Sequence, residues 1–345
     1  MHTNTTRLAV TALALGAVAP LSASSPSAVQ EHELRRRQPL EVREDRVTSS
    51  PLARGILPAD TSFVVHVDLQ GLMRSVWWKS VEEATGIMDE IADDDDFAEM
   101  SREFGVDPFK DFLGVTVIGH DEDGDDAVVV IHATDRIDAA LDRVRAMDEY
   151  RLVAHDGLEL ECFMEGDDEA VFGAVLGERE STDVRVVVGQ NRDRVSKVIR
   201  TMLGDANSVA DIDGAAVQAQ PRKGSYVFVE VGLPFAELLE DTPASRVASK
   251  ARRFTLDMGQ RKDSVFIDAV VESGSDRDAR DIADVVNGVR SMVTLSGVLE
   301  QIPVGLSEAF EDARAEIDGR SVRMGLSIPI EDLRESLIEL QEQYR

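Results

Sequence analysis

Hydrophobic and polar residues alternate along the chain in two similar series of segments, each predicting strands and helices in the same order. In the strand predicted over 62–69, Phe63 and Val65 lie on one face and Val64 and His66 on the other. The other elements predicted for the first series are a helix over 72–84, a hairpin over 113–119 and 127–133, a helix over 136–147, strands flanking Asp156-Gly157, strands over 171–176 and 184–188, and a helix over 192–203.

The second series repeats this plan. Its predicted elements are a strand over 225–231, a short helix over 235–239, a hairpin over 254–258 and 265–271, a helix over 279–293, strands flanking Asp318-Gly319, and a helix over 330–341. The middle helices share one apolar spacing, that of Ile137, Ala140, Leu141, Val144 and Met147 and of Ile282, Val285, Val286, Val289 and Met292. Amphipathic helices in general show such spacing, but both helices also end in the phrase Val-Arg-x-Met, at 144–147 and 289–292, and both follow a predicted hairpin. These shared features favour an internal duplication.

Many hairpins mixed with helices favour an α+β fold over a doubly wound parallel one. We therefore predict two related halves of antiparallel sheet packed with helices. The first half is placed at 58–204 and the second at 223–345. The small, polar residues of 205–222 are interpreted as the connector between them.

The first 24 residues resemble a secretory signal peptide. Arg7 precedes an apolar stretch from Leu8 to Leu21, and the small residues 22–24 follow as a cleavage region. The stretch is short for a membrane span, although an uncleaved N-terminal anchor is the alternative. Residues 25–57 show little periodicity and are predicted to form a flexible linker. We find no later apolar run long enough to span a membrane, so the protein is expected to be exported, to the periplasm or outside the cell.

Composition narrows the possible partners. The net charge of −29 repels phosphate backbones, so we expect no nucleic-acid partner. The single cysteine, Cys162, excludes an intrachain disulfide and is expected to be buried in an alternating apolar strand.

Two groups of residues could bind a metal. His66 and Asp68 share a strand face, and His132 lies on another strand, so three ligands for a transition metal could converge. The alternative is three polar residues on the wetter face of a sheet. Asp121, Asp123 and Asp125 could bind calcium in an acidic turn, although the turn does not match an EF-hand and equally suits a solvated hairpin tip. Otherwise we expect no cofactor.

Two adjacent tryptophans, Trp77 and Trp78, lie in the first predicted helix. One of them is expected to belong to the core. The other, Trp78, is a candidate partner-binding residue, because exposed tryptophans are often found in interfaces.

The phrase from Leu57 to Leu69, Leu-Pro-Ala-Asp-Thr-Ser-Phe-Val-Val-His-Val-Asp-Leu, resembles the start of the mature region in a family of exported bacterial proteins of unknown function. The similarity extends through Gly105-Val106-Asp107-Pro108 and the following hairpin, and loosely covers 57–345. The resemblance implies export. It implies no activity or catalytic residues, because the family has no established activity.

The sequence contains no Walker loop, no Gly-x-Gly-x-x-Gly after a strand, no Gly-x-Ser-x-Gly and no His-Glu-x-x-His. Export and duplication without such a motif favour a non-enzymatic binding or structural protein with an unknown protein or apolar ligand as its partner. Two alternatives stay open. One is a carrier that holds an apolar ligand between sheet and helices. The other is a metal-assisted hydrolase that uses His66, Asp68 and His132.

Overall fold

The computed structural model describes residues 52–86, 88, 101–120, 126–165, 169–177, 184–232, 249–296 and 303–343. The predicted signal peptide, most of the predicted linker, the short helix predicted over 235–239 and the acidic turn with Asp121, Asp123 and Asp125 lie outside these residues. The described residues belong to one compact unit, 49–345. No helix among them is long and apolar enough to cross a membrane.

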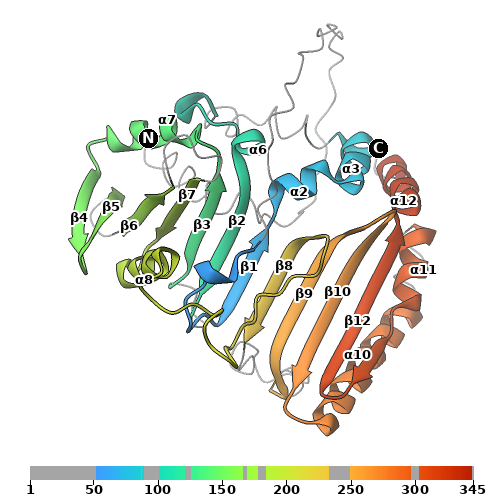
Figure 1. Ribbon diagram of the computed structural model, residues 1–345. Coiled ribbons are helices and arrows are strands. Elements are labelled where there is room, and N and C mark those ends of the chain that lie inside the picture. The colour runs from blue at the N-terminus through green and yellow to red at the C-terminus, as the bar shows by residue number, and fades with distance from the viewer. Residues whose placement is uncertain are drawn as a thin grey trace, which may run out of the picture. The chain divides into compact units, whose positions relative to one another are not determined.

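The protein has an α+β fold built on one antiparallel sheet (Figure 1). The strands are β1 (Phe63–Val67), β2 (Phe112–Gly119), β3 (Val128–Ala133), β4 (Tyr150–His155), β5 (Leu158–Glu165), β6 (Glu169–Leu176), β7 (Val184–Gly189), β8 (Ser225–Gly232), β9 (Ala251–Arg261), β10 (Ser264–Ser273), β11 (Ala315–Asp318) and β12 (Ser321–Pro329). The helices are η1 (Arg54–Ile56), α2 (Leu69–Arg74), α3 (Val76–Thr85), α6 (Pro108–Asp111), α7 (Ile137–Arg145), α8 (Arg192–Leu203), α10 (Asp276–Leu295), α11 (Val304–Asp312) and α12 (Ile330–Gln343).

Within the described residues, the sheet contains 12 strands in the order β11-β12-β10-β9-β8-β1-β2-β3-β7-β6-β5-β4. The strands β1 and β8 pair in the middle (Figure 1). On the β1 side of this pair, the next strands outward are the hairpin β2–β3 and then β7. On the β8 side, they are the hairpin β9–β10 and then β12. The helices α7 and α10 each follow the hairpin of their own side. The two predicted halves are therefore parts of one continuous sheet.

The two faces of this sheet differ in burial. On the face that packs against α8, called the α8 face here, Val64, Val130 and Val187 are 0% exposed. They belong to a core cluster that includes Val195 and Val198 of α8. The opposite face, called the α10 face, packs against α10 at Val271 and Val322 and against α11, α12 and Trp77 at Val265 and Ile328.

Residues outside the strands complete the core of the α8 face. Ile56 and Leu57, which the sequence places at the end of the linker, are buried in that core. Val209 and Val217 of the predicted connector are 0% exposed in the same cluster. Burial of these side chains fixes both segments on the sheet, because apolar surface removed from water contributes about 25 cal/mol per Å². Both segments therefore pack as parts of the folded unit.

Candidate functional site

The structure brings together two of the three residues predicted to bind a transition metal. His66 and His132 are buried on the α8 face, with ring centroids 6.2 Å apart. Thr116 of β2 lies between them: its Oγ1 is 2.9 Å from His66 Nδ1 and 3.3 Å from His132 Nε2. A single hydroxyl thus contacts both imidazoles. In sequence, this hydroxyl is recognisable only as one polar residue in the otherwise apolar strand 112–119.

Asp68 has another role. Its Oδ1 accepts a hydrogen bond from Gly71 N at 2.9 Å and so caps the N-terminus of α2. A Cβ at Gly71 would lie 2.4 Å from the other carboxylate oxygen, so the cap requires glycine there. Within the described ranges, no group of three or more His, Cys, Asp or Glu side chains could hold a metal ion. The geometry therefore indicates a helix cap beside a buried histidine pair.

Trp78, the candidate partner-binding residue, is only partly exposed in the structure. Trp77 packs against the cluster of Val265 and Ile328, and Trp78 is half-buried with its ring edge-on to Trp77, at a centroid distance of 6.3 Å. Two helices replace the single one predicted over 72–84, because the Ser75 side chain accepts a hydrogen bond from Trp78 N and caps α3. Cys162 is buried, as predicted.

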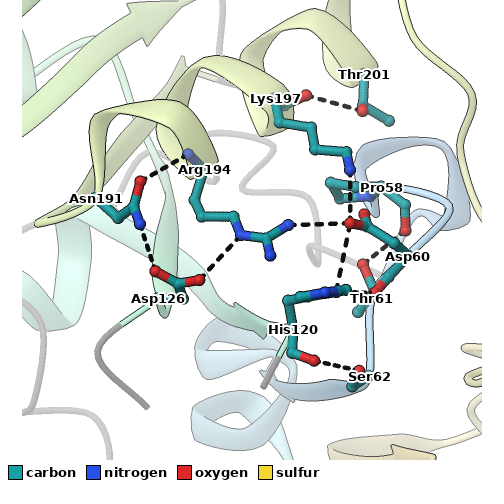
Figure 2. Close-up of polar contacts among 10 residues, drawn as sticks. All are labelled: Pro58, Asp60, Thr61, Ser62, His120, Asp126, Asn191, Arg194, Lys197 and Thr201. Carbon is teal, nitrogen blue, oxygen red and sulfur yellow. Dashed lines mark hydrogen bonds and ion pairs between the residues drawn. The ribbon is translucent and has the colours of Figure 1, made fainter. Parts of the chain in front are cut away.

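A charged cluster that the sequence did not reveal joins the Pro58–Asp60 turn to α8 (Figure 2). Arg194 lies between two carboxylates, with Nη1 2.9 Å from Asp60 Oδ2 and Nε 3.1 Å from Asp126 Oδ2. Lys197 Nζ is 2.5 Å from Asp60 Oδ2, and His120 Nδ1 is 2.6 Å from the Asp60 carbonyl oxygen. One feature of the sequence points to this cluster: Arg194 and Lys197 are three residues apart in a predicted helix, so both basic side chains lie on the same helix face.

This cluster lines a small pocket of about 20 Å³, partly open to solvent, whose volume corresponds to roughly one water molecule. Partial burial would raise the pKa of Asp60, but hydrogen bonds from Lys197 and Arg194 outweigh burial and hold that pKa below its usual value of 3.8. The cluster therefore fastens the segment 52–61 to α8 through ionised side chains.

Replacing Asp60 by asparagine is expected to lower the free energy of unfolding by about 1 kcal/mol at pH 7. Because the folded-state pKa is lowered, the contribution of the carboxylate is complete above about pH 5 and is lost as pH falls through the folded value. Urea unfolding of wild type and Asp60→Asn at pH 7 and pH 3 measures the difference, which should shrink at pH 3. The matched control is Asp205→Asn, at an exposed aspartate just beyond α8. An equal loss in both variants would contradict a specific role for Asp60.

The α10 face is the most distinctive surface of the molecule. On this face, the side chains of residues that pair across neighbouring strands form rows that run across the sheet. Three adjacent rows contain only apolar residues from β12 through β1 and at least as far as β2. The middle row crosses the strands from β12 to β7 and consists of Met324, Ala269, Leu256, Val229, Val65, Val117, Val129 and Val188. All eight are half-buried, in contrast to the fully buried valines of the α8 face. Antiparallel sheets with one solvated face usually have polar residues there. Between β12 and β7, the middle row of this face has none.

Helix α10 adds exposed apolar side chains beside this row. Asn287 Oδ1 accepts a hydrogen bond from the backbone of Ala315 on the edge strand β11, so this flank of α10 faces the sheet edge. Val285, Val289 and Met292 lie about 140–160° around the helix from Asn287, on the opposite flank of α10. They are 42%, 49% and 65% exposed. We refer to the middle row and these three residues together as the apolar surface.

No protein-family model matches the sequence, and no curated protein matches it. Among solved structures, crystal form III of a protein called TP0453 aligns with a TM-score of 0.43 and 9% identity, over 85% of this chain and 100% of that chain. Crystal form I of TP0453 aligns with a TM-score of 0.40 and 9% identity, over 84% of this chain and 98% of that chain. These values are too low to support an argument about function.

Proposed function

We propose that this is an exported, non-enzymatic binding protein that holds an apolar ligand against the α10 face of its sheet. The observation that supports it best is the half-buried middle row of the apolar surface. Contiguous exposed apolar surface is uncommon on soluble proteins and usually marks a binding site.

The exposed flank of α10 supports an apolar ligand in particular. If this flank of α10 were buried, its apolar side chains would contribute only to the protein core. Val285, Val289 and Met292 instead leave apolar surface in contact with solvent beside the sheet. Met292 adds an unbranched, polarisable side chain that adapts to ligands of different shape. The chemistry of these side chains suits alkyl groups and offers no group for catalysis.

Export is part of this proposal and is supported by the composition of residues 1–24. Internal duplication is also part of it. Its support is the matching order of elements on the two sides of the β1–β8 pair, where α7 and α10 occupy the same position after their hairpins. A duplicated sheet would double the length of the apolar surface.

The proposal is tested by titrating the natively purified full chain with Nile red, a neutral dye that fluoresces in apolar surroundings. We expect saturable binding that a long-chain alcohol displaces and that disappears when urea unfolds the protein. Measured fluorescence that stays at the level of free dye, with the protein folded by circular dichroism, would defeat the proposal.

A further inference from the structure

The length of the apolar surface indicates which class of apolar ligand it fits. Its middle row crosses eight neighbouring strands, from β12 to β7. At about 4.8 Å between strands, the row is roughly 34 Å long. A bilayer core of about 30 Å contains two leaflets, so one acyl chain spans roughly 15 Å. The row is therefore about twice as long as one acyl chain.

The row also divides evenly at the central strand pair. Met324, Ala269, Leu256 and Val229 lie on the β8 side, and Val65, Val117, Val129 and Val188 lie on the β1 side. Val65 and Val229 are cross-strand partners, so the surface stays apolar across the junction. Each side is long enough for one chain, and no polar side chain of the row separates them.

Charge determines the kind of head group that this surface tolerates. The net charge of −29 repels anionic amphiphiles. Beyond Val188 and Gly173, the next residue of the same row is Glu161, an acidic residue already paired with Arg145. A fatty acid with its carboxylate at this outer end of the row would place its charge beside this acidic side chain. A neutral or zwitterionic head group above the middle of the row avoids it.

We infer that the ligand is a lipid with two acyl chains and no net charge, one chain lying on each half of the sheet. This inference rests on the proposed function and adds the ligand class and its stoichiometry. Each chain would cover half of the middle row, and the exposed flank of α10 would contact the chain on the β8 side. Binding would remove this apolar surface from water, which stabilises the complex.

The test uses the full chain and native mass spectrometry after incubation with vesicles of dioleoyl phosphatidylcholine or with micelles of the single-chain oleoyl lysophosphatidylcholine. We expect one diacyl lipid or two single-chain lipids per protein. Leu256→Glu changes the β8 side and Val117→Glu the β1 side, and each should reduce the single-chain stoichiometry from two to one. The control Ser327→Glu, at an exposed position of the α8 face, should leave it at two.

The outcomes separate this inference from the proposed function. Nile red binding together with one single-chain lipid per protein, lost in either variant, would overturn the two-chain inference and leave the proposed function standing. A folded protein that binds neither dye nor lipid would overturn both. A solution mass of twice the chain, with no lipid bound, would show that a second copy covers the surface and would also overturn the inference.

Discussion

Replacing Leu326 by glutamate is expected to weaken Nile red binding about tenfold or more, whereas replacing the next residue, Ser327, should change it less than about twofold. The two residues are adjacent on β12 and point to opposite faces. Leu326 is half-buried in the apolar row beside the middle row, and Ser327 is exposed on the α8 face. A carboxylate at 326 would have to be desolvated when an apolar ligand binds, and the same group at 327 would stay in water.

Dye titration measures both affinities, and thermal unfolding measures whether both variants are folded. Because each variant adds one carboxylate to the same strand, a general effect of charge would be shared by the pair. Equal affinities for Leu326→Glu and Ser327→Glu would place the dye elsewhere on the molecule. A loss confined to Leu326→Glu would locate binding on the α10 face.

The largest stability effect is expected for Glu230→Ala, which should lower the free energy of unfolding by about 3–5 kcal/mol. Glu230 is 2% exposed in β8. Its Oε1 accepts a hydrogen bond from Gln218 N at 2.9 Å, its Oε2 accepts one from Ala219 N at 2.6 Å, and Arg253 Nε is 3.5 Å from Oε1. Alanine would leave two backbone donors and a guanidinium without this acceptor in a buried position. Urea unfolding measures this loss of unfolding free energy, and an unchanged m-value would show that the change lies in stability alone.

Glu230→Gln is the matched control, because it keeps one acceptor oxygen and should cost less than alanine. It also tests the titration of this group. Burial raises the pKa of Glu230 above its usual value of 4.5, against the backbone hydrogen bonds that lower it. The folded protein therefore binds this proton more tightly, and stability is lost as pH rises through the folded value. The advantage of wild type over Glu230→Gln should grow as pH falls from 7 toward 4.5. A constant difference across this range would contradict the raised pKa.

Prediction from sequence succeeded where local pattern decides structure. The alternation in 62–69 places Phe63 and Val65 on one face and Val64 and His66 on the other, as in β1. The Asp156-Gly157 turn lies between β4 and β5, with both residues at positive φ, because aspartate and glycine tolerate the left-handed conformation. The helix predicted over 279–293 is the central part of α10.

Prediction failed where contacts join residues far apart in the chain. The polar composition of 205–222 predicted a connector, but Val209 and Val217 are buried against the sheet. Arg194 and Asp126 are 68 residues apart and form an ion pair that periodicity cannot reveal. Glu230 interrupts an apolar strand, and this break in the pattern indicates that the carboxylate has a buried partner. The pattern does not indicate which residue that partner is.

The sequence by itself determined the strands, their two faces and most of the helices, because backbone geometry sets the periods of 2 and 3.6 residues. Only the tertiary structure decided that both series join in one sheet through β1 and β8. It also decided that Asp68 caps a helix and that the middle row of valines is half-buried on the α10 face. Such outcomes depend on strand order and on which segments pack over each face, and local sequence patterns do not specify either.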